Sequence, residues 1–287
     1  MPGTGNAFFS LVVQPMIWVV GHRGSPTEEV ENTIPSFERA VGRDGANALE
    51  MDISVTRDGD LLVWHDFDPT GLDARLRQWN LEPQVRYRPR SFDGPISNLT
   101  LREARERVGF VGARDVYVPT LAEVFDWART HPSLGLVFLD VKLPADRMDL
   151  LPGLLTRLET LVAVAAPRFE VVLECGELDL AVALRESGVR HPVALDVRSK
   201  AAIDAVARLG LPWACAQKPR PLQSLFPFRR QCQLLAECNH GCSRCAFTIN
   251  DEDEMRALVE LGVSAIQTDR PAVLRAVVDR HHGRAAA

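Results

Sequence analysis

Segments with two different hydrophobic periodicities alternate along most of the chain. Short apolar runs, some with every second residue polar, predict strands, and segments with apolar residues three or four positions apart predict helices. Eight main strands are expected at residues 16–20, 47–55, 134–142, 169–175, 191–197, 213–217, 244–250 and 265–269, with a further short one at 61–64. Helices are expected at residues 34–43, 121–130, 150–163, 178–187, 200–209, 231–239 and 252–261.

This alternation predicts an α/β protein with a parallel sheet. A closed barrel and an open doubly wound sheet both fit the order of the elements. The chain lacks the glycine-rich fingerprint of the open dinucleotide-binding sheet, and its 287 residues match the usual length of a (β/α)8 barrel. We therefore predict one TIM barrel domain over residues 1–287.

One segment interrupts the alternation. Residues 67–98 have no clear hydrophobic period and are rich in Arg, Pro and Gln. We predict a small insertion here, after the second strand of the barrel. The composition fits a segment that forms part of the rim of a pocket, and it fits an ordinary surface loop equally well.

The net charge and the hydropathy of the chain bear on whether it binds nucleic acids or membranes. The formal net charge is -5 and no basic arm is visible, which argues against non-specific binding to nucleic acids. The most apolar stretch, residues 7–20, is shorter than a membrane span and is interrupted by Gln14-Pro15. We expect a cytoplasmic protein with no stable membrane insertion and no signal peptide.

Four of the six cysteines gather late in the chain. They are Cys232, Cys238, Cys242 and Cys245, with His240 among them. Such residues can bind Zn²⁺, but the spacing matches no common zinc pattern, and residues 232–239 resemble one helix. We therefore favour reduced, mostly buried thiols over a zinc site.

The strongest chemical signal lies in residues 47–55. Because side chains alternate sides along a strand, Glu50 and Asp52 share one face, and apolar residues occupy the other. Two adjacent carboxylates repel unless a cation or a proton lies between them, and no basic partner stands within the strand. We predict a site for a hard divalent cation such as Mg²⁺ or Ca²⁺. The alternative is an amphipathic strand with two solvated acids.

Five short motifs occur in order around this pair. They are His22-Arg23-Gly24, Glu31-Asn32-Thr33, Glu50-x-Asp52, Thr56-x-Asp58-Gly59 and His65-Asp66. Together with Thr268-Asp269-Arg270-Pro271 near the end of the chain, this order resembles the glycerophosphodiester phosphodiesterase family, one of the TIM barrel phosphodiesterases that are similar to phosphatidylinositol-specific phospholipase C. The resemblance covers nearly the whole sequence.

The resemblance implies a metal-dependent hydrolase in which two histidines act as general acid and base. The matching residues are His22 and His65, and an imidazole with a pKa of about 6.5 suits either role. Arg23 and Lys142 would contact the phosphate, because cationic side chains bind phosphate oxygens. Glu31 is expected to organise the substrate site.

A third metal ligand is expected on the strand at 134–142. There Asp140 and Lys142 share one face, at the position where the family usually has Glu-x-Lys. Asp140 keeps the ligand type in a shorter side chain and would complete a three-carboxylate site with Glu50 and Asp52. The alternative for Asp140 and Lys142 is a structural ion pair.

Two positions depart from the family where the leaving-group pocket is expected. Phe247 replaces a common Trp, and Glu174-Cys175 replaces a usual Ser-Phe pair. Phe247 is assigned to substrate binding on this basis.

The implied reaction is hydrolysis of glycerophosphodiesters to glycerol 3-phosphate and an alcohol. One alternative is a lysophospholipase D that acts on lysophospholipids with the same site, and an apolar rim around Leu222 to Phe228 would favour it. A second alternative is a catalytically silent barrel that binds phosphate or metal. Every catalytic residue type is present, which favours an enzyme with a small-molecule phosphodiester or lysophospholipid substrate.

Overall fold

Strands and helices alternate along the structure, a computed structural model that describes residues 16–72, 74, 94–110, 116–219, 224–238 and 241–285. The strands are β1 Trp18–His22, β2 Ala48–Val55, β3 Leu61–Val63, β4 Leu136–Val141, β5 Glu170–Cys175, β6 Val193–Val197, β7 Trp213–Gln217, β8 Ser243–Phe247 and β9 Ala265–Thr268. The helices are α1 Ile34–Gly42, α3 Leu101–Arg107, α4 Leu121–Ala128, α5 Leu151–Ala165, α6 Leu178–Glu186, α7 Lys200–Leu209, α8 Pro227–Glu237, α9 Glu252–Glu260 and α10 Pro271–Ala285, with short 3-10 helices η1 Ile96–Asn98 and η2 Ala145–Leu150.

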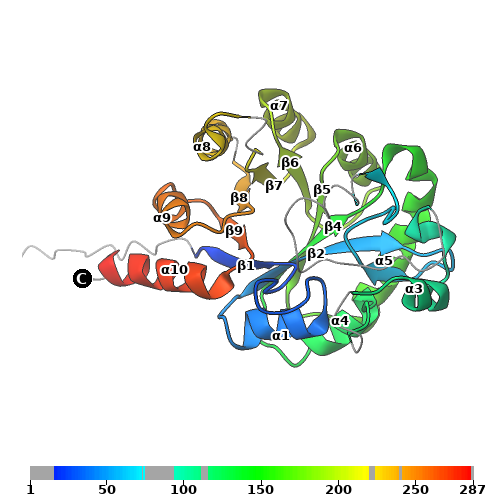
Figure 1. Ribbon diagram of the computed structural model, residues 1–287. Coiled ribbons are helices and arrows are strands. Elements are labelled where there is room, and N and C mark those ends of the chain that lie inside the picture. Colours follow the sequence, from blue (N-terminus) through cyan, green and yellow to red (C-terminus); the bar gives the residue numbers. More distant parts are fainter. Residues whose placement is uncertain are drawn as a thin grey trace, which may run out of the picture.

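The strands close into a barrel. Hydrogen-bonded neighbours run β1-β9-β8-β7-β6-β5-β4-β2, and β1 also pairs with β2, which joins the two ends of the sheet. Every pair in this ring is parallel. The helices lie around the outside of the strands (Figure 1). The (β/α)8 barrel expected from the sequence is confirmed.

β3 lies outside this ring and runs antiparallel to β2. One edge of β2 pairs with β4, and the other pairs with β1 at residues 48–50 and with β3 at residues 53–55. β3 therefore lies beyond the carboxyl end of β1 and returns the chain toward it. The backbone N–H of Trp64 donates to the carbonyl oxygen of Asp52 at 3.0 Å. This return sets the next residue, His65, beside the end of β2.

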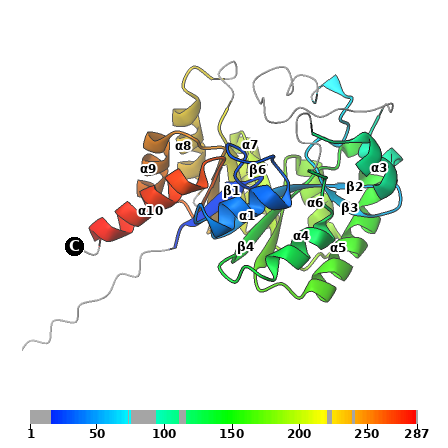
Figure 2. The same cartoon turned by 60° about the horizontal axis from the view of Figure 1, so that its bottom comes forward.

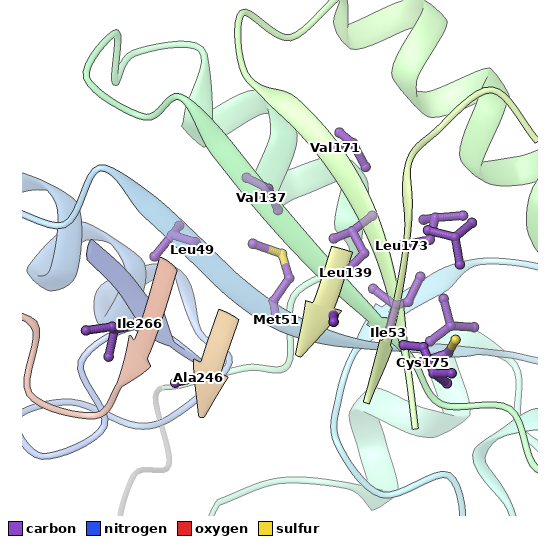
Figure 3. Close-up of a cluster of buried hydrophobic side chains, with 14 of the residues drawn as sticks. Leu49, Met51, Ile53, Val137, Leu139, Val171, Leu173, Cys175, Ala246 and Ile266 are labelled. Carbon is purple, nitrogen blue, oxygen red and sulfur yellow. The ribbon is translucent and has the colours of Figure 1, made fainter. Parts of the chain in front are cut away.

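The barrel wall separates two hydrophobic cores. Outward side chains of the strands pack toward the helices, and Figure 3 shows Leu49, Met51 and Ile53 of β2 in this layer. Inward side chains fill the barrel, where the rings of Phe138 and Trp213 meet edge to face with their centroids 5.1 Å apart. On the inward face, apolar residues come first along each of β2, β4, β5 and β6, and acids follow at the carboxyl ends. This order puts polar groups at one mouth of the barrel.

A smaller apolar cluster supports β3 from outside the barrel. Its buried members are Leu62, Trp64, Ile96, Leu99, Ala104, Val108, Phe110 and Val118. The rings of Trp64 and Phe110 have centroids 5.7 Å apart. The cluster joins β3 to η1 and α3, so it fixes the segment that carries His65.

Strand boundaries differ from the expected ones where polar residues end a strand. β1 covers Trp18–His22 rather than residues 16–20, because its pairing with β2 continues through His22. The seventh strand of the barrel, β8, ends at Phe247 and leaves Asn250 beyond it. Hydrophobicity marks the buried part of a strand, whereas backbone pairing continues into polar residues.

Two helices also differ from expectation. The single helix expected to reach residue 239 is wrong in its bounds, since α8 begins at Pro227 and ends at Glu237. α10 has no counterpart among the expected helices, although it buries Leu274, Val277 and Val278 at helical spacing. α10 lies beside α9 in both views (Figure 1 and Figure 2).

Most of the expected insertion at 67–98 lies outside the described residues, which include only 67–72, 74 and 94–98 of it. The carbonyl oxygen of Phe67 accepts a hydrogen bond from the backbone N–H of Ile96 at 2.8 Å, so these two described parts meet. Within the described chain, no helix is both long and apolar enough to span a membrane.

The turn after β1 requires glycine at one position. Gly24 has a φ of +95°, and a Cβ there would lie 2.3 Å from Oγ of Ser36. That hydroxyl accepts from the backbone N–H of Ser25 at 2.8 Å and donates to the carbonyl oxygen of Arg23 at 3.0 Å. A side chain at position 24 would separate α1 from the turn that carries Arg23.

We predict that Gly24→Ala lowers the free energy of unfolding by about 2 kcal/mol or more, because left-handed strain and a steric clash add. Gly59→Ala is the matched control, since Gly59 has a φ of +84° but a Cβ there would meet nothing within 4 Å. Only the strain, about 1 kcal/mol, applies to the control. Urea unfolding followed by tryptophan fluorescence measures both, and equal losses would contradict the role of Ser36.

Candidate active site

Polar side chains converge at the carboxyl ends of β1, β2 and β4. His22 ends β1, Glu50 and Asp52 lie on β2, and Asp140 lies near the end of β4. Glu50 pairs in register with His22, and Asp52 with Asp140. The carboxyl ends of parallel strands meet at one mouth of a barrel, where barrel enzymes build their sites.

Three of these side chains form a carboxylate cluster. One oxygen each from Glu50, Asp52 and Asp140 can be chosen so that all lie within 4.8 Å of one another. Glu50 and Asp52 are buried, and Asp140 is half-buried. Mg²⁺ and Ca²⁺ prefer such oxygen ligands, so these residues fit the metal site expected from the sequence.

Two cations offset the charge of this carboxylate cluster. Nε of Arg23 lies 3.1 Å from Oδ2 of Asp52, and Nζ of Lys142 lies 3.0 Å from Oδ1 of Asp52. Lys142 also pairs with Asp140. No basic partner of Asp52 stands within β2, as expected, and its two partners come from just after β1 and just after β4. The ion pair between Asp140 and Lys142 exists, and it is part of the cluster.

The loop between β1 and α1 orients Arg23. Glu31 accepts a hydrogen bond from Nη1 of Arg23 at 3.0 Å, and both residues are buried. Asn32 donates from Nδ2 to Oδ2 of Asp52 at 2.6 Å. The φ of Asn32 is +57°, a conformation that Asn tolerates better than most residues. The structure thus places Glu31 against the guanidinium of Arg23.

These contacts give the two acids of β2 different protonation states. Burial, and then the charge of Asp52, raise the pKa of Glu50 to about 8. Burial would also raise the pKa of Asp52, but Arg23 and Lys142 outweigh it and hold that pKa well below its usual value. Burial opposes the charge of Lys142, but Asp140 and Asp52 raise its pKa. In the metal-free protein Glu50 therefore holds a proton near neutrality.

Each candidate histidine has a carboxylate on one ring nitrogen. Nδ1 of His22 lies 2.6 Å from Oδ1 of Asp269, and Nδ1 of His65 lies 2.7 Å from Oδ1 of Asp66. Such a contact fixes the ring and leaves Nε2 available for chemistry. Nε2 of His22 lies 3.8 Å from Oε2 of Glu50, so this ring faces the carboxylate cluster.

Asp269 and Asn250 are site residues that the sequence-based assignment of roles leaves out. Asn250 donates from Nδ2 to Oδ2 of Asp269 at 2.6 Å and accepts the backbone N–H of Asp269 at 2.9 Å. Burial and Arg23 would lower the pKa of His22, but Asp269 and Glu50 outweigh them and raise it. The feature that could have identified Asp269 as a site residue is its position directly after the last strand. That strand, β9, pairs with β1, which carries His22.

The other half of the barrel mouth carries a second pair of acids. Glu174 of β5 and Asp196 of β6 are both buried. Nε2 of Gln267, on β9, donates across the barrel to Oε2 of Glu174 at 2.8 Å. Phe247 ends β8 and packs, half-buried, against the barrel interior. Its position at this mouth is the expected one, and its role in substrate binding stays a prediction.

All six cysteines are free thiols, and within the late group Cys238 and Cys242 lie in hydrogen-bond contact with each other. Cys245 lies in the barrel interior, in register with Cys215 of β7, whereas Cys238 ends α8. In the part of the chain that the structure describes, groups of three or more possible metal ligands occur only at the carboxylate cluster. His240 lies outside the described residues. One pair of thiols with no third ligand among the described residues supports reduced thiols rather than a zinc site.

Comparison with known proteins decides the family. The pattern of the Glycerophosphoryl diester phosphodiesterase family matches residues 22–273. The chain belongs to this family. The glycerophosphodiester phosphodiesterase of Caldanaerobacter subterraneus subsp. tengcongensis is 27% identical over 275 residues, which cover 89% of this chain and 95% of that protein. The glycerophosphodiester phosphodiesterase of Bacillus subtilis is 24% identical and covers 91% of this chain and 86% of its own.

Solved structures share the fold of this glycerophosphoryl diester phosphodiesterase family member. A phosphodiesterase of Oleispira antarctica in complex with the product sn-glycerol-3-phosphate has a TM-score of 0.69 at 20% identity and covers 93% of this chain and 97% of that chain. A glycerophosphodiester phosphodiesterase of Parabacteroides distasonis has a TM-score of 0.68 at 18% identity and covers 95% and 99%. The barrel is therefore common to all three proteins.

We predict that the metal-free protein loses stability as the pH rises from about 5 to about 8. The pKa of Glu50 is about 8 in the native state against an ordinary value of 4.5. The native state therefore binds this proton more tightly than the unfolded state does. The resulting stabilisation is complete below the unfolded pKa and is lost as the pH rises through the native pKa.

Thermal unfolding in a chelator at constant ionic strength measures this dependence. Glu50→Gln should reduce the slope of Tm against pH, because the amide does not titrate. Glu170→Gln, at an exposed position on β5, should leave the slope unchanged. A slope that Glu50→Gln does not alter would contradict the raised pKa.

Proposed function

We propose that this protein hydrolyses glycerophosphodiesters to glycerol 3-phosphate and an alcohol. The observation that supports this most directly is one barrel mouth that holds three carboxylates, two cations and two histidine–carboxylate pairs. A phosphodiester needs stabilisation of its negative charge and groups that move protons at the attacking and leaving oxygens. The names of the relatives, one of them with sn-glycerol-3-phosphate bound, support the same substrate class.

Glu50, Asp52 and Asp140 would hold one divalent cation, Mg²⁺ or Ca²⁺. All three offer oxygen, which suits these ions better than soft metals. When bound, the cation neutralises the phosphodiester and stabilises the charge that develops in the transition state. The ligands must be ionised, so Glu50 releases its proton on loading.

Arg23 and Lys142 would bind the phosphate oxygens. Both already lie at the carboxylate cluster through their contacts with Asp52. The guanidinium of Arg23 is oriented by Glu31, and its planar fork suits two phosphate oxygens. Lys142 adds a point charge on a flexible stem.

His22 and His65 would move the protons. One ring takes a proton from the attacking hydroxyl, and the other gives a proton to the alcohol as its bond to phosphorus breaks. Asp269 and Asp66 hold Nδ1 of the two rings, so Nε2 is the reactive nitrogen in each. If a neighbouring hydroxyl of the glycerol attacks first, a cyclic phosphate forms, and water then opens it.

Lysophospholipids form the second candidate substrate class. Between β7 and α8, Leu225 is 91% exposed and Phe226 is 67% exposed. Exposed large apolar side chains directly before α8 suit an acyl chain or a lipid surface. The apolar rim expected around Leu222 to Phe228 is found only in part. Leu222 lies outside the described residues, and Phe228 packs against the outer core.

We predict that His22→Ala and His65→Ala each lower kcat at least about 100-fold, the lower range for loss of an acid–base group. Asp269→Asn should cost about 10-fold, because it leaves the ring in place but weakens its orientation. Asp279→Asn, at an exposed pair on α10, should have no effect. Rates are measured on glycerophosphocholine and on lysophosphatidylcholine with Mg²⁺ or Ca²⁺ at saturation.

The faster of the two substrates decides between the two candidate functions. A histidine variant that keeps the wild-type rate on both substrates would make that ring structural. Activity that persists in full after chelation would exclude the metal assignment.

A further pair of variants separates phosphate binding from metal binding. Lys142→Met keeps most of the stem and removes the charge, so we expect KM to rise about 10-fold while metal affinity changes little. Asp140→Asn removes a ligand charge, so the metal Kd should rise about 10-fold or more. Calorimetric titration with Mg²⁺ or Ca²⁺ measures the second effect. If both variants bind metal and turn over substrate like the wild type, the pair is only a structural salt bridge.

A further inference from the structure

Two acids at the barrel mouth take no part in the chemistry above. Glu174 on β5 and Asp196 on β6 are 2% and 7% exposed, and each lies on the inward face of its strand. Glu174 pairs in register with Asp140, and the charges of Asp140 and Lys142 both act on Asp196. The acid pair therefore adjoins the candidate phosphate site.

One oxygen of this pair has no hydrogen-bond donor outside the pair itself. Oε2 of Glu174 accepts from Gln267, and Oδ2 of Asp196 lies 3.3 Å from Nη2 of Arg198. Oδ1 of Asp196 is buried and has no hydrogen-bond partner among the described residues, apart from what a protonated Glu174 can give it. Burial, and then Asp196, hold the pKa of Glu174 well above its usual value, so Glu174 can supply this donor. A cationic ligand with N–H donors would replace that proton and bind both carboxylates.

The nearby cation does not balance the two acids. The side chain of Arg198 is 51% exposed, and it also donates to Oε1 of Gln217 at 2.6 Å and lies 3.9 Å from Glu177. One half-exposed guanidinium thus faces two buried carboxyl groups. Burial, and then Asp140, raise the pKa of Asp196 to about 7, as expected where acids outnumber cations.

We propose that Glu174 and Asp196 bind the far end of the substrate alcohol, and that this end carries a primary ammonium group. This inference rests on the function proposed above. β5 and β6 are the next strands of the ring after β4, which carries Asp140 and is followed directly by Lys142. An alcohol that extends from a phosphate held at Lys142 in that direction passes over the acid pair.

The primary ammonium meets both needs of this pair. Its N–H groups donate to Oδ1 of Asp196, and its charge offsets the repulsion between Asp196 and Glu174. A trimethylammonium group has the charge but no N–H donor. A terminal hydroxyl has the donor but no charge. Diesters of ethanolamine should therefore be preferred over those of choline and of glycerol.

The test compares glycerophosphoethanolamine, glycerophosphocholine and glycerophosphoglycerol. In the wild type, kcat/KM should be highest for the ethanolamine diester, by about 10-fold. Asp196→Asn keeps the shape and removes the charge. It should lower kcat/KM for the ethanolamine diester by about 10-fold to 100-fold and leave the glycerol diester within about 3-fold. Asp204→Asn, the exposed partner of Lys200 on α7, should change none of the three values.

The possible outcomes separate this inference from the proposed function. A wild type that turns over all three diesters without preferring the ethanolamine diester overturns the inference alone. Equal losses on all three diesters in Asp196→Asn do the same, and an unchanged metal requirement in that variant excludes an indirect effect through the carboxylate cluster. A wild type that is inactive on all three overturns the proposed function. The wild-type ranking needs no variant, so it decides the question even if Asp196→Asn does not fold.

Discussion

The buried carboxylate of Asp52 lies between Arg23 and Lys142, and the rest of the site depends on this balance of charge. Acids packed as closely as Glu50, Asp52 and Asp140 repel one another strongly in a medium of low polarity. The two cations come from just after β1 and just after β4, so they also tie together the ends of three neighbouring strands. In the proposed reaction a divalent cation would take over this charge balance, and the same two side chains would face the phosphate.

Short-range patterns in the sequence were enough to predict alternating strands and helices and the pair Glu50 and Asp52, whereas the family resemblance supplied Asp140. Glu50 and Asp52 share a face because a strand repeats every second residue, and this holds whatever the rest of the chain does. The alternation of strands and helices is also local information, and it predicted an α/β protein; the chain length and the absence of a glycine-rich fingerprint favoured the closed barrel. Boundaries were less accurate, since β1 extends through the polar His22 by backbone pairing that hydrophobicity does not report.

The contacts that complete the site connect residues far apart in the sequence, and their identities could not be read from the strands alone. Asp269 meets His22, and Gln267 meets Glu174, only because the ring of strands closes. β1 pairs with only the first part of one edge of β2, and β3 pairs with the rest of that edge. The position of His65 depends on this second pairing. A sequence pattern marks these residues as polar strand ends without stating which of them become neighbours.

The contact between His22 and Asp269 joins the first strand of the barrel to the last one. During synthesis, β1 leaves the ribosome before β9 does. The imidazole therefore acquires its carboxylate only after β9 and Asp269 have been translated. The acids of β2 and β4 have no such delay, because both strands emerge in the first half of the chain. A polypeptide that ends before β9 thus holds the acids of β2 and β4 without the carboxylate that orients His22.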